Sequence, residues 1–508
     1  MDIIFWGALL RLVQAILLAA PTILVGLMVT AVFRTLLGHE GTRKLFGHGS
    51  NRALFQAWLM GMLLPVCSLG VIPIVRELRR AGLSGGTILA FALTAPLFNP
   101  LSVLYGLTLS SPVVIVTFSL CSLLIVTLAG WGWDKMFSGT AAPEPEPPRI
   151  APGYKRILGV MTTTAKELIS SSGIYMLMGL LGVASLSILL PAGYLQSAAE
   201  ADDPFAPLFM GMVMVPAYAN PMTAMIQLSA MFEHGNSVGA SFALLALGSG
   251  VNLGLLVWML WTYGTRRAVV WMAMLFTMVV AISYGVDRPL YPQGVEPAGH
   301  THAFDGYCSP FPPGTPSPPS AFRSTLVQKT EIFELVPLGL LGVIFCAGLL
   351  LITLDRKSRI DAWLLVTRAK SQARLDVELS PKVVGAVAIA GLILLSFLGV
   401  YVYYPEPEFV FEELSVANTH VGSAALSQDW ERAERWIPVY DDWTRKLEVS
   451  HFLRGKNLSR YQQAKLAVLR DKLEVLKHEC EAQEAEEAKD MGMDVTRAYR
   501  RLRAAFGL

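Results

Sequence analysis

Ten apolar runs that approach or exceed the length of a membrane-spanning helix constrain this chain more than any other feature. A helix needs about 20 apolar residues to cross the hydrocarbon core of a bilayer. Lipid admits only helices and closed barrels, because these pair all of their backbone groups. Runs of this length predict helices, so the expected fold class is an all-α, polytopic integral membrane protein. The runs lie near residues 10–36, 53–75, 83–108, 110–133, 173–197, 205–231, 238–262, 266–284, 332–354 and 383–404.

Composition agrees with this class and argues against several others. Charged residues make up 16% of the 508 residues, whereas an average soluble protein carries about 25%. A formal net charge of +2 gives no basic field that would indicate a nucleic-acid partner. The five cysteines are scattered without CxxC spacing and favour neither a disulfide framework nor a zinc module. The N-terminus lacks the basic start and cleavage site of a secretory signal, so the first run is expected to remain as a span.

An internal repeat with an offset of 153 residues relates the two parts of the apolar region. The asparagine pair carries most of the weight, because glycine and alanine match by chance in membrane segments. Pro65 also matches Pro216 if the second copy contains two additional residues. Transporter folds are often built from such duplications. The matched pairs are Gly82 and Gly235, Gly86 and Gly239, Ala90 and Ala243, and Asn99 and Asn252.

The basic loops predict how these two halves cross the membrane. Loops rich in Lys and Arg stay cytoplasmic, but the basic stretches on the two sides of run 53–75 would face opposite sides if that run crossed once. The conflict is removed if 53–75 and 205–231 are re-entrant pairs of half-helices, and a broken helix that still crosses is the alternative. Each half then crosses three times, so the second half is inverted relative to the first. The stretches placed inside are 43–52, 76–80, 135–166, 266–267 and 355–382.

The chain is expected to fall into six parts. Residues 153–172, at the start of the second repeat, are expected to form an amphipathic interfacial helix. The parts are a first permease repeat (1–136), a linker (137–152), a second repeat (153–285), a Pro/His-rich extracytoplasmic loop (286–330), two additional membrane helices joined by a basic cytoplasmic loop (331–405) and a C-terminal helical domain (406–508).

The C-terminal domain contains a leucine series that allows two interpretations. Leu466, Leu469, Leu473 and Leu476 alternate by three and four residues and continue to Cys480, a pattern typical of a helix with one apolar face. We favour a packing face within a small helical bundle. The alternative is a coiled coil with a second copy of the chain or with another protein.

Four breaks interrupt the apolar runs at matching places, 65–70, 95–100, 216–221 and 248–252. Proline removes a backbone donor, and unpaired backbone is tolerated at membrane depth only where protein or a water-filled cavity surrounds it. The breaks therefore predict either a central binding site or four locally capped kinks. The prolines that define them are Pro65, Pro96, Pro100, Pro216 and Pro221. The candidate substrate-binding residues are Cys67, Ser68, Asn99, Tyr218, Asn220, Ser249 and Asn252.

The first break also carries a resemblance to a known family. Residues 65–73 (PVCSLGVIP), 78–82 (LRRAG) and 87–91 (TILAF) are similar to the predicted permease family that includes organoarsenical and heavy-metal efflux permeases. Over roughly residues 1–285 the resemblance implies an efflux permease of the bacterial inner membrane. The second cysteine of the family pattern is Leu69 here, and Tyr218 stands in the matching turn of the second half. Because soft metals prefer several sulfur ligands, metal, metalloid and organic toxicant all remain candidate cargoes.

The predicted outer loop contains His300, His302, Asp305 and Cys308. These residue types are ligands for zinc or copper, so this loop is a candidate metal site. The alternative is a histidine-bearing linker that holds no metal, and no other cofactor is expected.

The remaining patterns favour a transporter over an enzyme. The sequence shows no Ser/His pair, no HExxH motif and no paired intramembrane aspartates, and no buried acidic relay that would indicate proton coupling. We expect a permease that binds a small molecule or ion near the midplane and works by alternating access, with membrane lipid as its other partner. The alternative is a membrane-anchored scaffold or sensor whose C-terminal domain carries the function.

Overall fold

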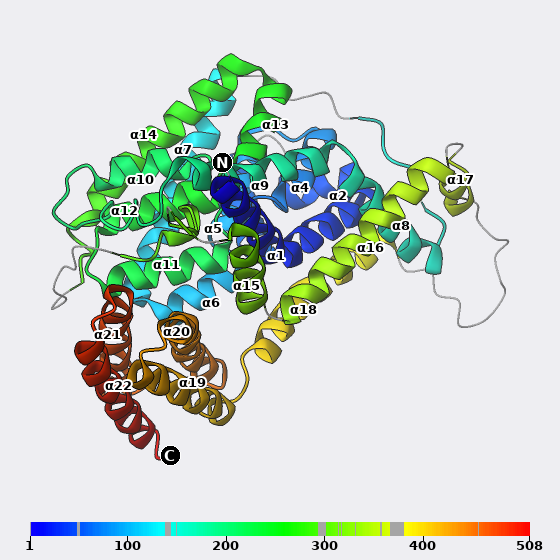
Figure 1. Ribbon diagram of the computed structural model, residues 1–508. Helices are drawn as coiled ribbons and strands as arrows, with labels where there is room; N and C mark the ends of the chain where they lie inside the picture. The colour runs from blue at the N-terminus through cyan, green and yellow to red at the C-terminus, as the bar shows by residue number, and fades with distance from the viewer. Residues whose placement is uncertain are drawn as a thin grey trace. The chain divides into compact units, whose positions relative to one another are not determined.

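The computed structural model describes residues 2–47, 51–137, 144–148, 150–292, 301–312, 314–315, 317–330, 332–355, 358–365, 380–455 and 457–508. Within these residues every regular element is a helix and no strand occurs (Figure 1). The predicted all-α fold class is confirmed. The chain forms two compact units, of which the first ends at Ser396 and the second spans Phe397–Leu508.

The helix boundaries follow the predicted apolar runs, and run 332–354 coincides with α16. The first half contains α1 (Asp2–Val32), the π-helical turn η1 (Phe33–Leu37), α2 (Gly38–Phe46), α3 (Asn51–Leu63), α4 (Val71–Arg80), α5 (Gly85–Leu97), α6 (Pro100–Leu109) and α7 (Pro112–Met136). The second half contains α8 (Tyr154–Ile169), α9 (Ser171–Leu189), α10 (Ala206–Met214), α11 (Pro221–Glu233), α12 (Val238–Ala243), the π-helical turn η2 (Leu244–Ser249), α13 (Leu253–Tyr263) and α14 (Thr265–Asp287). After these come η3 (Asp305–Tyr307), α15 (Pro318–Lys329), α16 (Ile332–Leu354), α17 (Arg359–Leu365) and α18 (Pro381–Tyr403).

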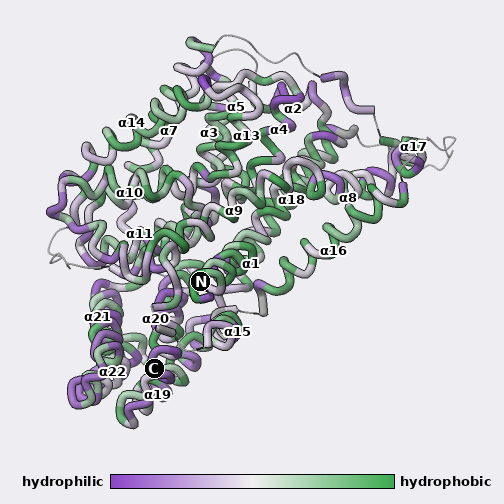
Figure 2. The backbone as a smooth tube through the Cα atoms, turned by 45° about the horizontal axis from the view of Figure 1, so that its top comes forward, coloured by the Kyte–Doolittle hydropathy of each residue, from purple (hydrophilic) through white to green (hydrophobic). Residues whose placement is uncertain are grey.

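Six helical stretches in the described part of the chain are long and apolar enough to cross a membrane. Two further helix pairs pass the same test together, α5 with α6, bent by 46°, and α12/η2 with α13, bent by 58°. If each bent pair is one span, eight spans result, three in each half and two after them. Figure 2 shows this apolar character along α1, α9 and α16. The protein is therefore an integral, multi-pass membrane protein.

Helices α3 and α4 form a hairpin whose first and last residues lie at the same end of the membrane unit. Leu54, near the start of α3, lies close to where a Cβ of Gly130 would stand, beside the Gly86 carbonyl of α5. Gly61, near the end of α3, faces Thr94, near the end of α5, so α3 and α5 run in the same direction. Helix α4 leads directly into the start of α5 and must run the opposite way. This is the geometry of a re-entrant pair.

The second half repeats this arrangement with α10 and α11. A Cβ at Gly239, in α12, would lie 3.0 Å from Pro207 of α10, and a Cβ at Gly248, in η2, would lie 3.4 Å from Met214. Helices α10 and α12/η2 therefore run in parallel, and α11 returns to the start of α12. Both predicted re-entrant segments thus have the same hairpin form.

The predicted 153-residue repeat recurs in the hydrogen bonds of the two halves. Gly86 N donates to Asp134 Oδ1 at 2.8 Å, and Gly239 N donates to Asp287 Oδ1 at 2.7 Å. Asp287 stands 153 residues after Asp134. In the same way, Ser84 and Ser237 cap α5 and α12 and donate to these aspartates. The turns before them contain Gly82 and Gly235, with φ of +79° and +60°, conformations that favour glycine.

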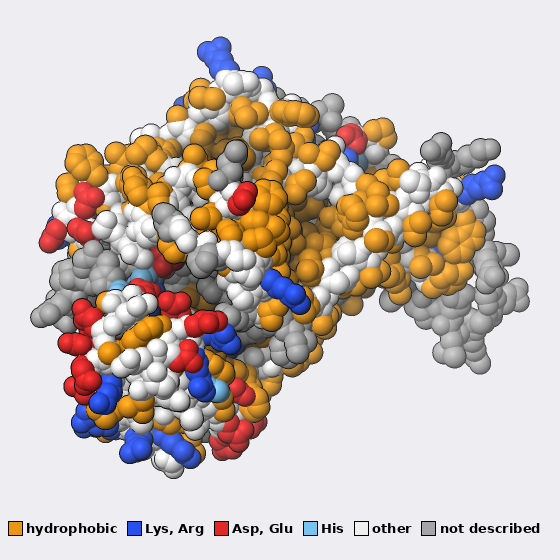
Figure 3. Space-filling model, in the orientation of Figure 1, with side chains coloured by type: hydrophobic (Ala, Val, Ile, Leu, Met, Phe, Trp, Pro, Cys, Tyr) orange, Lys and Arg blue, Asp and Glu red, His pale blue; other side chains and the backbone are white. Residues whose placement is uncertain are grey.

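After the end of α18, the described residues of the C-terminal unit form four helices, each packed against its neighbours around one apolar core. They are α19 (Pro407–Ser427), α20 (Trp430–Leu453), α21 (Arg460–Ala482) and α22 (Ala485–Ala505). The leucine series of α21 is buried in this core together with residues of the other three helices. The apolar face is therefore used inside the unit, as in a helical bundle. Figure 3 shows charged side chains gathered on these helices, whereas apolar side chains cover much of the membrane region.

We predict that Gly26→Ala destabilises the membrane unit. A Cβ at Gly26, in α1, would overlap the Gly70 carbonyl oxygen in the first break, which is backbone and cannot move aside easily. The expected loss of stability is about 1–3 kcal/mol, as for other overpacked interiors, measured as a lower Tm of the detergent-purified protein. Gly342→Ala in α16 is the control, because nothing lies within 4 Å of its Cβ position. An unchanged Tm for Gly26→Ala would contradict the close helix approach.

Candidate substrate-binding site

The structure brings the four breaks together in pairs within each half. Asn99 Nδ2, in the second break, donates to Val66 O in the first break at 3.3 Å. Ala219 N, in the third break, donates to Gly248 O at the fourth break at 2.9 Å. Each bond pairs a main-chain group that a broken helix leaves without an intrahelical partner. The breaks therefore satisfy one another's backbone.

Contacts between the halves place all four breaks in one region. A Cβ at Gly179, in α9, would touch Leu69 of the first break and would lie 2.7 Å from Asn252 Oδ1 of the fourth. A Cβ at Gly250 would lie 3.5 Å from Leu97 at the end of α5. The glycine at position 179 is therefore needed for the approach of segments from both halves.

The prolines occupy positions where their missing N–H is tolerated. Pro100 and Pro221 begin α6 and α11, and a first helical residue has no intrahelical acceptor for its N–H. Pro65 and Pro216 lie in the non-helical segments themselves, and Pro96 lies in the last turn of α5.

The asparagines of the breaks act as helix caps. Asn99 Oδ1 accepts from Ser102 N and Asn252 Oδ1 accepts from Leu255 N, both at 2.9 Å. Asn220 Oδ1 accepts from Met222 N at 3.1 Å, while its Nδ2 donates to Leu18 O of α1 at 2.7 Å. The Oδ1 atoms of these asparagines therefore cap helices, which is the alternative that the sequence left open beside a binding role.

Four other polar groups in the breaks have no hydrogen-bond partner within the described residues. They are the Ser68, Tyr218 and Ser249 hydroxyls and Asn252 Nδ2, and all four side chains are buried. Buried polar groups are nearly always paired in proteins. Their environment is therefore suited to an additional polar ligand or water.

A cavity of about 280 Å³ lies beside the third break, between the two halves. Of the predicted substrate-binding residues, Tyr218 and Asn220 line it, whereas Cys67, Ser68, Asn99, Ser249 and Asn252 are buried and do not line it. Its full lining is Arg11, Gln14, Ala15, Leu17, Leu18, Val183, Tyr218, Ala219, Asn220, Thr223, Gln227, Gly306, Tyr307 and Glu334.

Sequence reasoning missed the polar residues that α1 and α11 contribute to this cavity. Arg11 and Gln14 lie three residues apart, and Thr223 and Gln227 lie four apart, so each pair shares one helix face. Polar pairs at this spacing inside an apolar helix were the sequence feature that could have predicted a polar cavity wall.

Cys67 lies directly behind Tyr218. Its sulfur accepts from Gly70 N at 3.4 Å, and the Tyr218 hydroxyl lies beside Cys67 and Thr22. Cys67 has no exposed surface. The thiol therefore supports the turn and is separated from the cavity by the tyrosine.

A segment of the predicted outer loop, residues 301–311, lies at one end of the cavity, which Gly306 and Tyr307 line. Arg11 Nε donates to Cys308 O at 3.0 Å and its guanidinium also contacts Asp305 O. The Tyr307 hydroxyl donates to Gln227 Oε1 at 3.1 Å. Burial raises the pKa of Tyr307, and the hydrogen bond to Gln227 offsets this only in part, so the hydroxyl remains a donor at neutral pH.

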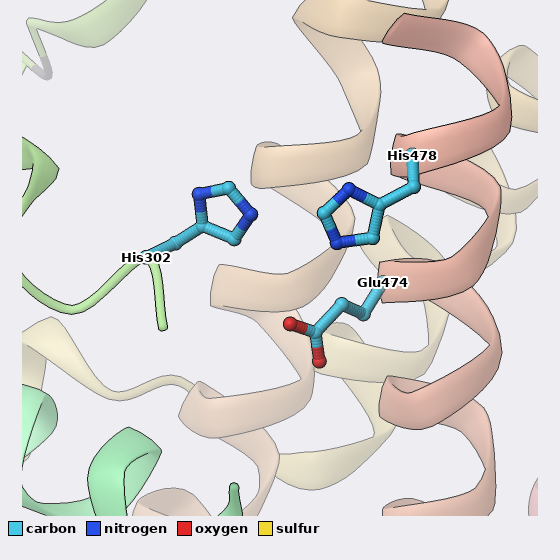
Figure 4. A group of neighbouring side chains, drawn as sticks. All are labelled: His302, Glu474 and His478. Atoms are coloured by element: carbon cyan, nitrogen blue, oxygen red, sulfur yellow. The ribbon is translucent and has the colours of Figure 1, made fainter. Parts of the chain in front are cut away.

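The candidate metal ligands of this loop are only partly brought together. His302 Nδ1 pairs with Asp305 Oδ2 at 2.8 Å, but His302, Asp305 and Cys308 do not place three ligand atoms within 4.8 Å of one another. His300 lies outside the described residues, so the four-residue metal site stays a prediction. Figure 4 shows His302 on its loop and, on α21 of the other unit, Glu474 and His478 one turn apart. A pair on one helix supplies fewer ligands than a structural metal site uses.

We predict that Cys67 resists N-ethylmaleimide in the folded protein, because buried thiols are inert. The control is Thr223→Cys, which places a thiol on the cavity wall. Labelling followed by peptide mass spectrometry should show Cys67 reacting more slowly than the introduced cysteine by roughly a hundredfold. Equal rates would contradict the burial of Cys67.

The comparisons with known proteins cover the part of the chain that contains this site. A family model described as a predicted permease matches residues 5–287. UPF0718 protein YcgR of Bacillus subtilis (strain 168) is 25% identical over 272 residues, which cover 52% of this chain and 90% of that protein. No solved structure matches. The family match ends with α14, so α15 to α22 lie beyond it.

Proposed function

Because the chain belongs to the predicted permease family, we propose that it is a secondary permease whose two halves move a small solute by alternating access. The proposed site is the 280 Å³ cavity. The family match covers the two halves of the membrane unit, residues 5–287, and excludes the C-terminal unit. This supports transport by the membrane core over a scaffold whose function resides in the C-terminal helices.

The observation that carries the proposal is that both halves line one cavity beside the third break. The first half supplies the face of α1 that contains Arg11 and Gln14. The second half supplies Val183 of α9, Tyr218 of the third break and Gln227 of α11. Transporters commonly bind substrate near the midplane, at the interface of two repeats and beside discontinuous helices.

Two further observations support an inverted repeat. The matching hydrogen bonds at Asp134 and Asp287 favour duplication of one ancestral unit. The hairpins α3–α4 and α10–α11 return to the side of the membrane from which they enter, so each half crosses the membrane three times. Because three is an odd number of crossings, the second copy is inverted relative to the first. The proposed orientation keeps the basic stretches on the cytoplasmic side, in agreement with the positive-inside rule.

The cavity lining favours an organic toxicant over a metal or metalloid as the exported solute. Leu17, Leu18 and Val183 give it apolar walls, and Asn220 and Gln227 add amide groups. None of its lining residues is a cysteine, and soft metals prefer sulfur ligands. Efflux is the proposed direction because the resemblance is to efflux permeases.

We predict that Thr223→Trp abolishes the resistance conferred by expression of the protein. The indole would fill the cavity that Thr223 lines, so resistance should fall to the level of cells without the protein. The measurement is growth across a panel of metals, metalloids and organic toxicants, and the expected hit is an organic compound.

The matched control is Thr277→Trp, because Thr277 is exposed on α14 and its hydroxyl bonds only to Ala273 O of the same helix. This variant should protect as well as wild type. The proposal fails if wild type protects against nothing in the panel, or if Thr223→Trp protects as well as Thr277→Trp.

A further inference from the structure

A cluster of charged side chains lies at the end of the membrane unit away from the cavity. Its five members, Arg34, Arg76, Glu77, Arg80 and Glu167, are called the charge cluster below. The two carboxylates are almost completely buried, with 1% of Glu77 and 2% of Glu167 exposed. No local pattern connects the two carboxylates, because Glu167 lies 90 residues after Glu77.

Glu167 joins the two halves at this end of the membrane unit. It belongs to α8 of the second half, and it accepts from Arg34 Nη2 and Arg76 Nη1 of the first half, both at 2.9 Å. Arg80 Nη1 lies 3.9 Å away. Arg76 also donates to Ser170, at 3.1 Å, so the α8–α9 junction is held by several bonds.

Arg34 links the two carboxylates. Its Nε donates to Glu77 Oε2 at 2.8 Å while its Nη2 bonds Glu167. Glu77 also lies 3.3 Å from Arg80 Nη1 and 3.4 Å from His39 Nε2. Arg34 is in the π-helical turn η1, a distortion that is often found at functional positions.

The charges of this cluster are complementary. Burial opposes ionisation of Glu167, but Arg34, Ser172, Arg76 and Arg80 outweigh it and hold the pKa of Glu167 below its ordinary value. Helix α8 is outside the membrane-spanning stretches. Glu167 is therefore an ionised partner for the arginines at neutral pH.

The linker between the halves is fastened to the same place. Glu146 accepts from His39 N at 3.0 Å and from Glu40 N at 2.7 Å. Glu144 N donates to Arg80 O at 2.9 Å. Residues 144–146 of the linker therefore lie beside the charge cluster.

The cluster and the Arg11 end of the cavity lie toward opposite faces of the membrane. Arg11 lines the cavity and Arg34 belongs to the cluster, and the 23 residues between these positions on α1 and η1 span roughly 35 Å of helix. The hydrocarbon core of a bilayer is about 30 Å thick. The basic stretch 43–52 follows on the cluster's side, which is the predicted cytoplasmic face.

We propose that the charge cluster is the cytoplasmic gate of the permease, closed here by ion pairs between the halves and broken when the halves rock apart. A buried charge that loses its partner is strongly unfavourable unless water replaces it. The gate therefore has two stable arrangements, one with dry ion pairs and one with hydrated charges. This inference rests on the proposed alternating access of the same cavity.

The test measures from which side of the membrane the cavity can be labelled. It does not require the transported solute to be identified. Thr223→Cys is introduced alone and together with Glu167→Gln, and each full-length protein is placed in right-side-out and inside-out vesicles. A membrane-impermeant maleimide then labels Thr223→Cys, with mass spectrometry as the readout. With the gate weakened, labelling from the outer face should fall, and labelling from the cytoplasmic face should rise, by roughly tenfold.

The matched control is Lys166→Gln, one residue earlier on α8. It removes the Lys166–Asp361 ion pair, 2.7 Å long, which connects α8 to α17 and does not join the two halves. Labelling should stay as in Thr223→Cys alone. If Glu167→Gln fails to assemble, Arg34→Gln takes its place, because Arg34 is more exposed and contacts both carboxylates.

Unchanged labelling from both faces, in a variant that elutes as folded protein, overturns the gate. So does an equal shift in Lys166→Gln. Labelling does not depend on transport, so the experiment can contradict the gate without contradicting the permease proposal, and the reverse. A shift of accessibility with no resistance to any compound contradicts the permease proposal alone, and resistance without a shift contradicts the gate alone.

Discussion

Lipid cannot hydrogen-bond to the protein main chain, and this constraint accounts for the arrangement of the membrane unit. Four breaks expose backbone groups at membrane depth, where an unpaired group costs several kcal/mol. The structure pairs such groups across the breaks: the Asn99 side-chain amide donates to Val66 O, and Ala219 N donates to Gly248 O. A break is thus stable only beside another break, so the hairpins and bent spans of both halves meet in one region.

The same constraint separates the charged groups from the centre of the molecule. Asn99, Asn252 and Asn220 satisfy the broken backbone with neutral amides. Arg11 lies toward one face and the ion pairs of Glu167 toward the other. Between them the closely packed glycines allow backbone to touch backbone. A unit held by neutral contacts in the middle and by ion pairs at one end is suited to rocking about its centre.

The sequence predicted those features that depend on periodic or local patterns. Apolar length predicted α16 at its observed boundaries, and the balance of basic loops predicted the hairpins. The match of Asn99 with Asn252 predicted equivalent positions, which proved to be equivalent caps. Whether an asparagine caps a helix or faces a cavity could not be predicted, because both roles use the same side chain. The ion pairs of Glu167 depend on helices that meet only in the folded chain.

The account depends most on the re-entrant form of the hairpins, and sided cysteine labelling tests this most directly. Asp202 and Glu233 are exposed before and after the α10–α11 hairpin, and Lys44 is exposed in the first basic stretch. Each is replaced by cysteine and labelled with a membrane-impermeant maleimide in oriented vesicles. The account predicts labelling of positions 202 and 233 from the same face and of position 44 from the opposite face. Labelling of positions 202 and 233 from opposite faces would contradict it, because the hairpin would then be a crossing helix.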